Sequence, residues 1–127
     1  MRIDTETPAI FVDVKLTGKK GTCVVNAALD TGSTFSIISW KTAESLGYNP
    51  ASIKERVSIT TASGVEIIPL VTIEAIEALD VRKEKAKVGC HVLPPQATVN
   101  ALLGLDFLRK LVTKIDLKEG ILEFQDP

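Results

Sequence analysis

Alternation of apolar and polar residues begins near the amino terminus of the chain. Over residues 10–16 every second residue is Ile, Val or Leu, while Asp13 and Lys15 lie between them. This period of two predicts a strand with one buried face. The Gly-Lys-Lys-Gly sequence at 18–21 is typical of a turn. Residues 22–29 are again β-prone, so the two segments are predicted to pair as a hairpin.

The rest of the chain alternates short β-prone runs with turn sequences. Residues 57–61 and 65–70 flank Ala62-Ser63-Gly64, which predicts a second hairpin with glycine near its tip. Helical spacing of apolar residues occurs at 40–46 and 105–111. Further strands are predicted at 35–39, 71–76, 81–93, 101–104, 113–117 and 121–124. Many short strands at close intervals predict an all-β barrel or sandwich with one or two short helices.

Composition and charge narrow the classes of function. The chain has 127 residues, the size of one domain, and we expect residues 1–127 to form a single domain. A net charge of −1 provides no overall positive field, so no nucleic-acid partner is expected. No apolar run approaches the ~20 residues of a membrane helix, so no membrane partner is expected. No apolar stretch resembling a signal peptide precedes the first strand, and the expected localisation is cytoplasmic.

Residues that commonly bind metals or form disulfides are scarce. Cys23 and Cys90 are the two cysteines, too few for a disulfide framework, and His91 is the single histidine. A tetrahedral zinc site would need carboxylates or a second chain to complete it. We therefore expect no metal and no cofactor.

One short segment carries candidate chemistry. Asp30-Thr31-Gly32-Ser33 follows a strand of small and apolar residues, which places one carboxylate in a tight turn. Gly32 permits a close backbone approach, and Thr31 and Ser33 place hydroxyls beside the carboxylate. A carboxylate fixed in this way can act as a general base on water. The alternative is an ordinary β-turn, because all four residue types are turn formers.

Two further features of the sequence favour the chemical interpretation. The Ala62-Ser63-Gly64 hairpin follows the Asp-Thr-Gly segment, and Leu102-Leu103-Gly104 then precedes a short helix. In these three motifs and their order, from about Ile10 to Phe124, the chain resembles the retropepsin-like aspartic proteases. The resemblance implies a small closed acid-protease-type β-barrel of a single lobe, with a flap hairpin and short helices.

The segment after the third motif suggests a subgroup. Leu103-Gly104-Leu105-Asp106-Phe107-Leu108 is similar to the Leu-Gly-x-Asp-x-Leu of retrotransposon proteases and of ubiquitin-shuttle proteins. Retroviral members tend to carry an Arg and a second Asp that pair with each other. This chain has Leu105 and Thr34 at those two positions, so both halves of that ion pair are absent.

The resemblance also implies an assembly and a substrate. Because the chain has one Asp-Thr-Gly, the second carboxylate must come from a second copy, which predicts a homodimer with Asp30 and its mate on the two-fold axis. The substrate would be an extended peptide or protein segment. The carboxy-terminal hairpin 113–124 could contribute to the dimer interface, as terminal strands do in retroviral members.

Roles for individual residues follow from the family pattern. Thr31 would hydrogen-bond across the axis, Gly32 would leave room for the substrate, and Ser33 would donate to Asp30. Asp106 would support the loop, either as a helix cap or by bonding near Thr34. The remaining expected site residues are the flap, Thr61, Ala62, Ser63, Gly64 and Val65, and the pocket or loop-support residues Ile37, Leu103 and Gly104.

Two other classes of function stay open on the sequence alone. A retropepsin-like fold without catalysis could serve as a dimerisation or peptide-binding module. A small β-barrel that binds a ligand could contain the Asp-Thr-Gly motif by chance. The intact Asp30-Thr31-Gly32-Ser33 favours a homodimeric aspartic endopeptidase over both.

Overall fold

The alternating segments of the sequence form the strands of the protein. The computed structural model describes residues 1–61, 63–92 and 100–126. The strands are β1 Phe11–Gly18, β2 Gly21–Leu29, β3 Ile37–Ser39, β4 Arg56–Thr61, β5 Gly64–Ala78, β6 Val81–His91, β7 Ala101–Leu103, β8 Val112–Asp116 and β9 Ile121–Gln125. The helices are α1 Trp40–Ser45, the 3-10 turn η1 Pro50–Ser52, and α2 Leu105–Leu108.

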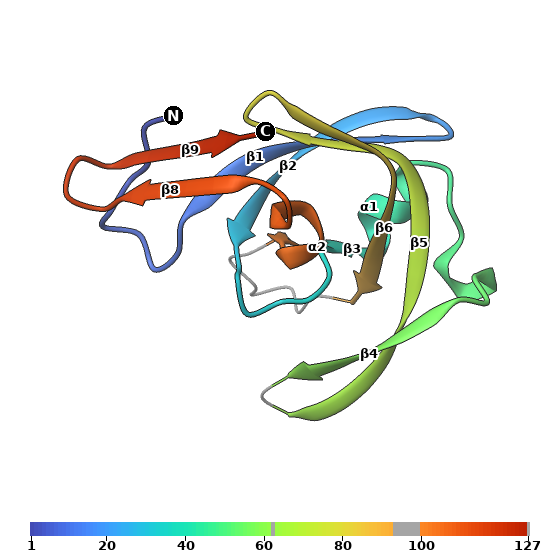
Figure 1. The fold of residues 1–127 in the computed structure, drawn as a ribbon. Coiled ribbons are helices and arrows are strands. Elements are labelled where there is room, and N and C mark those ends of the chain that lie inside the picture. The colour runs from blue at the N-terminus through green and yellow to red at the C-terminus, as the bar shows by residue number, and fades with distance from the viewer. Residues whose placement is uncertain (62, 93–99, 127) are drawn as a thin grey trace.

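Six of the strands close into a barrel. The sheet has the order β1-β2-β7-β3-β6-β5-β4, and an additional pairing of β1 with β5 closes it. The predicted all-β barrel with short helices is therefore confirmed. β4 lies outside the closed ring and pairs with the first part of β5, so this hairpin projects from the barrel (Figure 1).

The apolar faces predicted from the alternation line the interior of the barrel. Val12, Val14 and Leu16 of β1 are almost completely buried and belong to one core cluster. Phe107 of α2 and Leu103 of β7 join the same cluster from the other side of the fold. Burial of large apolar side chains of this kind contributes roughly 1.5–3 kcal/mol each, so this core dominates the stability of the barrel.

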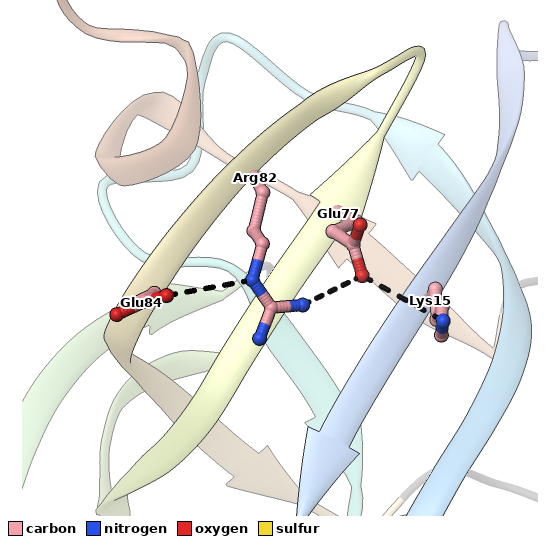
Figure 2. A network of polar contacts seen from close by, with 4 residues as sticks. All are labelled: Lys15, Glu77, Arg82 and Glu84. Carbon is pink, nitrogen blue, oxygen red and sulfur yellow. Dashed lines mark hydrogen bonds and ion pairs between the residues drawn. The ribbon is translucent and has the colours of Figure 1, made fainter.

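Charged side chains cross the seam at which the barrel closes (Figure 2). Glu77 on β5 contacts Arg82 on β6 at 2.9 Å and Lys15 on β1 at 3.9 Å, and Arg82 lies 3.7 Å from Glu84. Lys15 and Arg82 are both register partners of Glu77. Exposed pairs of this kind contribute about 1 kcal/mol or less each, so the network fixes strand register more than it adds stability.

Two predicted strands form one long strand. Residues 65–70 and 71–76 were expected to be separate, but β5 runs without interruption from Gly64 to Ala78. Its first part pairs with β4 and its later part with β6 and β1. The prediction of separate strands was wrong because the change of partner, at Pro69 and Leu70, occurs within a continuous strand that the proline does not interrupt.

The second helix is shorter than its apolar spacing predicts. The sequence pattern extends to Leu111, whereas α2 ends at Leu108 and Lys110 has φ of 69°. Lys83 donates to the carbonyls of Phe107 and Arg109, which fixes the carboxy-terminal end of the turn. Leu111 still packs against the core, so the spacing identified the buried side chains but overestimated the helix.

The carboxy-terminal hairpin pairs with the start of the chain. β8 and β9 form a separate two-stranded sheet, and Arg2 bridges Ile121 of β9. Leu122 exchanges backbone hydrogen bonds with Met1 on the same side. Apolar side chains on and after β8 are exposed: Val112 at 48 %, Ile115 at 41 % and Leu117 at 61 %. No helix in the described part of the chain is long and apolar enough to span a bilayer.

The two cysteines differ in burial, which predicts different reactivity. Both are free thiols, and burial raises the pKa of the Cys90 thiol to about 12, while Cys23 is only half-buried. Because the thiolate is the reactive form, we expect iodoacetamide at pH 8 to modify Cys23 well before Cys90 in the folded protein. Peptide mass spectrometry over time measures both rates, and unfolding in urea should equalise them. Equal rates without denaturant would contradict this burial.

Candidate active site

Asp30 lies at the end of β2, where the chain leaves the sheet. β2 runs parallel to β7, and the Asp30 backbone N–H donates to the Leu103 carbonyl at 3.0 Å immediately after their last register pair. The half-buried Asp30 carboxylate accepts from the Gly32 N–H at 2.9 Å. This local bond orients Oδ1 and leaves Oδ2 without a partner within the described residues. The carboxylate is therefore both oriented and accessible.

The chain segment after β7 threads beneath the loop that contains Asp30. The Ser33 carbonyl accepts from the Leu105 N–H at 2.8 Å, and the Thr34 carbonyl accepts from the Asp106 N–H at 3.1 Å. Gly104 directly precedes these two donor residues, and a Cβ added to it would be 2.7 Å from the carbonyl oxygens of Ser33 and Phe35. Only glycine allows two backbone segments to approach so closely. The predicted loop-support role of Gly104 thus has a clear geometric basis.

A buried serine connects the same two segments through its side chain. Ser36 is 1 % exposed. Its hydroxyl donates to Asp106 Oδ1 at 2.7 Å and accepts from the Gly104 N–H at 3.0 Å. Asp106 Oδ1 also accepts from the Ser36 N–H at 2.9 Å. Of the two structural roles expected for Asp106, the structure shows the bond to the loop, and the helix N-cap is Gly104.

Sequence reasoning missed Ser36. The available signal was a serine directly before Ile37-Ile38, because a polar residue next to a buried strand needs a hydrogen-bond partner. In this chain the serine and Asp106 join the two segments that an Arg–Asp pair joins in the retroviral pattern.

Loss of the Ser36 hydroxyl should loosen the loop. We expect Ser36→Ala to lower the free energy of unfolding by about 1–3 kcal/mol, because the Gly104 N–H loses its buried acceptor. Urea denaturation measures the change. Ser45→Ala is the matched control, since that exposed hydroxyl donates only to the Thr42 carbonyl of its own helix. Equal losses of stability in the two variants would contradict the supporting role of Ser36.

The other residues of the Asp-Thr-Gly loop are placed differently from one another. Thr31 and Gly32 are exposed, so both are available to a partner chain or a substrate. The Ser33 hydroxyl donates to the Phe35 carbonyl at 2.6 Å. The expected donation from Ser33 to Asp30 was therefore wrong for the isolated chain, because the closer carbonyl accepts the proton and the Gly32 N–H serves the carboxylate.

The apolar wall near the loop involves a different leucine from the one expected. Leu103 is completely buried in the core and supports the loop through its carbonyl, so its side chain does not line an open pocket. Leu102 is half-buried and pairs with Ile37 across β7 and β3. Ile37 and Ile68 both lie against Gly89, where an added Cβ would be within 2.8 Å of each Cδ1. Ile37, Leu102 and Ile68 are thus neighbouring apolar side chains, of which Ile37 and Ile68 are buried and Leu102 is half-buried.

The predicted flap is the β4–β5 hairpin. Thr61 Oγ1 lies 3.2 Å from both the Gly64 carbonyl and the Ser63 N–H, and Gly64 has φ of 121°. Val65 is 71 % exposed. Ala62 was also expected in the flap and lies outside the described residues.

A metal centre does not emerge from the described side chains. Over residues 1–61, 63–92 and 100–126, no three His, Cys, Asp or Glu side chains cluster so that they could hold an ion.

Comparison with solved structures identifies the same architecture in a known protease. A retropepsin-like aspartic protease from Rickettsia conorii superposes with a TM-score of 0.73, covering 98 % of this chain and 88 % of that one. The two sequences are 15 % identical, so this likeness establishes the fold.

Sequence comparisons agree with the structural one. Two fungal proteins called DNA damage-inducible protein 1 are similar: that of Saccharomyces cerevisiae is 24 % identical over 96 % of this chain, and that of Eremothecium gossypii is 28 % identical over 90 %. The chain spans only 27 % and 22 % of their lengths. A profile of the family described as "gag-polyprotein putative aspartyl protease" matches residues 12–110, which include Asp30, the β4–β5 hairpin and Gly104. The chain therefore belongs to the gag-type, retropepsin-like family of aspartic proteases.

Proposed function

We propose that this protein is an aspartic endopeptidase that acts as a homodimer. The observation that carries the proposal is the Asp30 carboxylate, oriented by the Gly32 N–H in a loop that Gly104 and Ser36 lock in place. One chain supplies one such loop. A two-fold dimer would place two of them together and complete the catalytic pair.

The reaction would use the two Asp30 carboxyl groups in different protonation states. Two carboxylates about 3 Å apart do not both ionise, so the pair holds one proton, as in other aspartic proteases. The ionised group takes a proton from water, whose oxygen attacks the peptide carbonyl carbon. The protonated group donates to the carbonyl oxygen, giving a tetrahedral diol. The carboxyl group that took the proton from water then gives it to the amide nitrogen, while the other carboxylate takes a proton from a hydroxyl of the diol. The C–N bond breaks, an acid and an amine are released, and the pair again holds one proton.

The exposed apolar side chains of the carboxy-terminal hairpin support the dimer. Val112, Ile115 and Leu117 are exposed on the β8–β9 hairpin, which forms a sheet of its own beside the barrel (Figure 1). Val112 and Ile115 lie on opposite faces of β8, so both faces of the hairpin carry exposed apolar side chains, which favours association with another surface. We propose that the hairpin packs against its symmetry mate and that Thr31, exposed beside Asp30, bonds across the axis.

The flap and the apolar wall support an extended peptide as substrate. The hairpin offers backbone donors and acceptors, which bind a peptide in a strand-like conformation. Ile37 and Leu102 would contact alternate side chains of that peptide, which favours apolar residues next to the cleaved bond.

Cleavage of a diverse peptide library tests the proposal. We expect purified protein to cut extended peptides within the range of about pH 4 to 7.5, which spans the upper part of such a dyad's titration. Sedimentation of the same sample should show a dimer. No cleavage at any pH in a verified dimer would contradict the enzyme and favour a peptide-binding module.

A further inference from the structure

A histidine and a glutamate join the flap to the barrel, and both residues are far from Asp30 in the sequence. His91 is the last residue of β6, and its Nε2 lies 2.6 Å from Oε2 of Glu66 on β5. The two side chains are 26 % and 42 % exposed, so the contact is only partly shielded from water. His91 is the single histidine of the chain. The contact is thus the one polar link in the protein whose charge depends on an imidazole.

The contact lies where the flap leaves the barrel. The β5–β6 ladder ends at the pair Leu70 and Gly89, and nearer the flap tip β5 pairs only with β4. Ile68 packs over Gly89 at the base of this arm. Glu66 is further out on the same arm, and its bond to His91 holds the arm to β6 beyond the end of the ladder. The arm is therefore held to β6 at two successive points, first by the apolar contact of Ile68 and then by the polar contact of Glu66.

Few other charges act on this histidine. It borders a groove of about 510 Å³ in which β5 contributes Glu66, β4 contributes Arg56 and β6 contributes the buried Cys90 thiol. β3 and α1 contribute the neutral Ser39, the register partner of His91, and Trp40. The sequence of residues 93–99 contains no ionisable side chain. Glu66 is consequently the acidic partner whose attraction for the imidazolium decides the strength of the contact.

We infer that His91 is a positioning residue that, through Glu66, holds the flap arm against the barrel at mildly acidic pH and releases it as the imidazole loses its proton. Histidine is the side chain whose charge most readily changes near physiological pH, and the contact is an ion pair only while the imidazole is protonated and the carboxylate is ionised. Removal of the imidazole proton, or protonation of the carboxylate, takes away one of the two charges. In both cases the contact weakens from an ion pair to an ordinary hydrogen bond.

The inference rests on the proposed function only for its consequence in catalysis. An arm that is held in place presents its peptide-binding edge in a fixed position, so less conformational entropy is lost when a substrate binds. The pair would therefore act mainly on KM, and KM would rise as the pH passes through neutrality. The effect on the arm itself is expected whether or not the protein cleaves peptides.

Amide hydrogen exchange of the arm tests the inference without any substrate. We expect backbone amides of residues 64–70 to exchange about fivefold more slowly at pH 5.5 than at pH 8, after correction for intrinsic rates, as one partly buried ion pair would allow. His91→Gln should remove this pH difference. His91→Lys, which keeps a positive charge at both values, should restore slow exchange at both.

An exposed ion pair on the same strand supplies the matched control. Lys87 of β6 contacts Glu55, just before β4, at 2.8 Å, with side chains 52 % and 49 % exposed. Glu55→Gln removes a charge pair near the base of the arm without involving the histidine. We expect it to leave the pH difference in exchange of residues 64–70 unchanged.

The outcomes separate this inference from the proposed function. A pH difference that persists in His91→Gln, or that disappears equally in Glu55→Gln, would overturn the role of His91. Amide exchange that responds as expected, in a protein that cuts no peptide, would support the role of the His91–Glu66 contact and contradict the proposed protease activity. Where cleavage is measured, His91→Gln should raise KM several-fold at pH 5.5 and leave kcat unchanged.

Discussion

An Asp30→Asn chain is expected to fold and dimerise normally and to lose peptide cleavage by a factor of about 1,000 or more. The substitution keeps the size of the side chain, and its amide oxygen can still accept from the Gly32 N–H. It removes the group that takes a proton from water, in both halves of the dimer at once. The rate of cleavage of one peptide, at equal protein concentration, measures the loss.

The same variant needs evidence that its structure is intact. Thermal unfolding and sedimentation should match the parent protein, because the loop is locked by Gly104 and Ser36 rather than by the Asp30 side chain. Cleavage that continues at the parent rate in a folded Asp30→Asn dimer would assign the activity to another residue or to a contaminating protease.

Gly104→Ala is expected to cause the largest loss of stability of any single methyl addition in the site. The new Cβ would stand 2.7 Å from two backbone carbonyl oxygens, those of Ser33 and Phe35. The Ser33 carbonyl cannot move without straining its bond from the Leu105 N–H, nor the Phe35 carbonyl without straining its bond from the Ser33 hydroxyl. We expect the free energy of unfolding to fall by roughly 3 kcal/mol, at the upper end for overpacked positions. Chemical denaturation gives the value directly.

Gly89→Ala provides the matched comparison for that prediction. A Cβ there would approach Ile68 and Ile37 to a similar distance, but through the terminal Cδ1 atoms of flexible side chains. Those side chains can rotate, so we expect a loss of about 1.5 kcal/mol or less. If Gly104→Ala were as well tolerated as Gly89→Ala, the close crossing of the two backbone segments would be wrong.

The alternation of residues was sufficient to predict the strands that have one buried face. β1 carries a clear period of two, and it pairs with β2 in the predicted hairpin. This feature is local, because a side chain's place on the inner or outer face follows from its own position in the strand. The crossing at Gly104 was indicated instead by the resemblance to the retropepsin-like family.

Features that depend on partners far away in the chain were harder to predict from the sequence. The single strand β5 changes partners at Pro69 and Leu70, and the sequence does not show that the strand continues through this proline. Leu103 was expected either to line a pocket or to support the loop, and its carbonyl does the latter, because adjacent leucines on a strand point to opposite faces and the sequence does not show which face meets the core. The Ser36–Asp106 bond joins residues far apart in sequence, so neither residue alone reveals it.

Mixing the parent chain with the Asp30→Asn chain tests most directly whether two copies of Asp30 form one active site. Equal amounts of the two chains are unfolded together and refolded. Their activity is compared with that of the parent chain alone, treated in the same way at the same total protein concentration. Because only dimers with two intact copies would be active, we predict about one quarter of the parent activity. About one half would mean that each chain carries a complete site of its own, which would contradict the shared dyad.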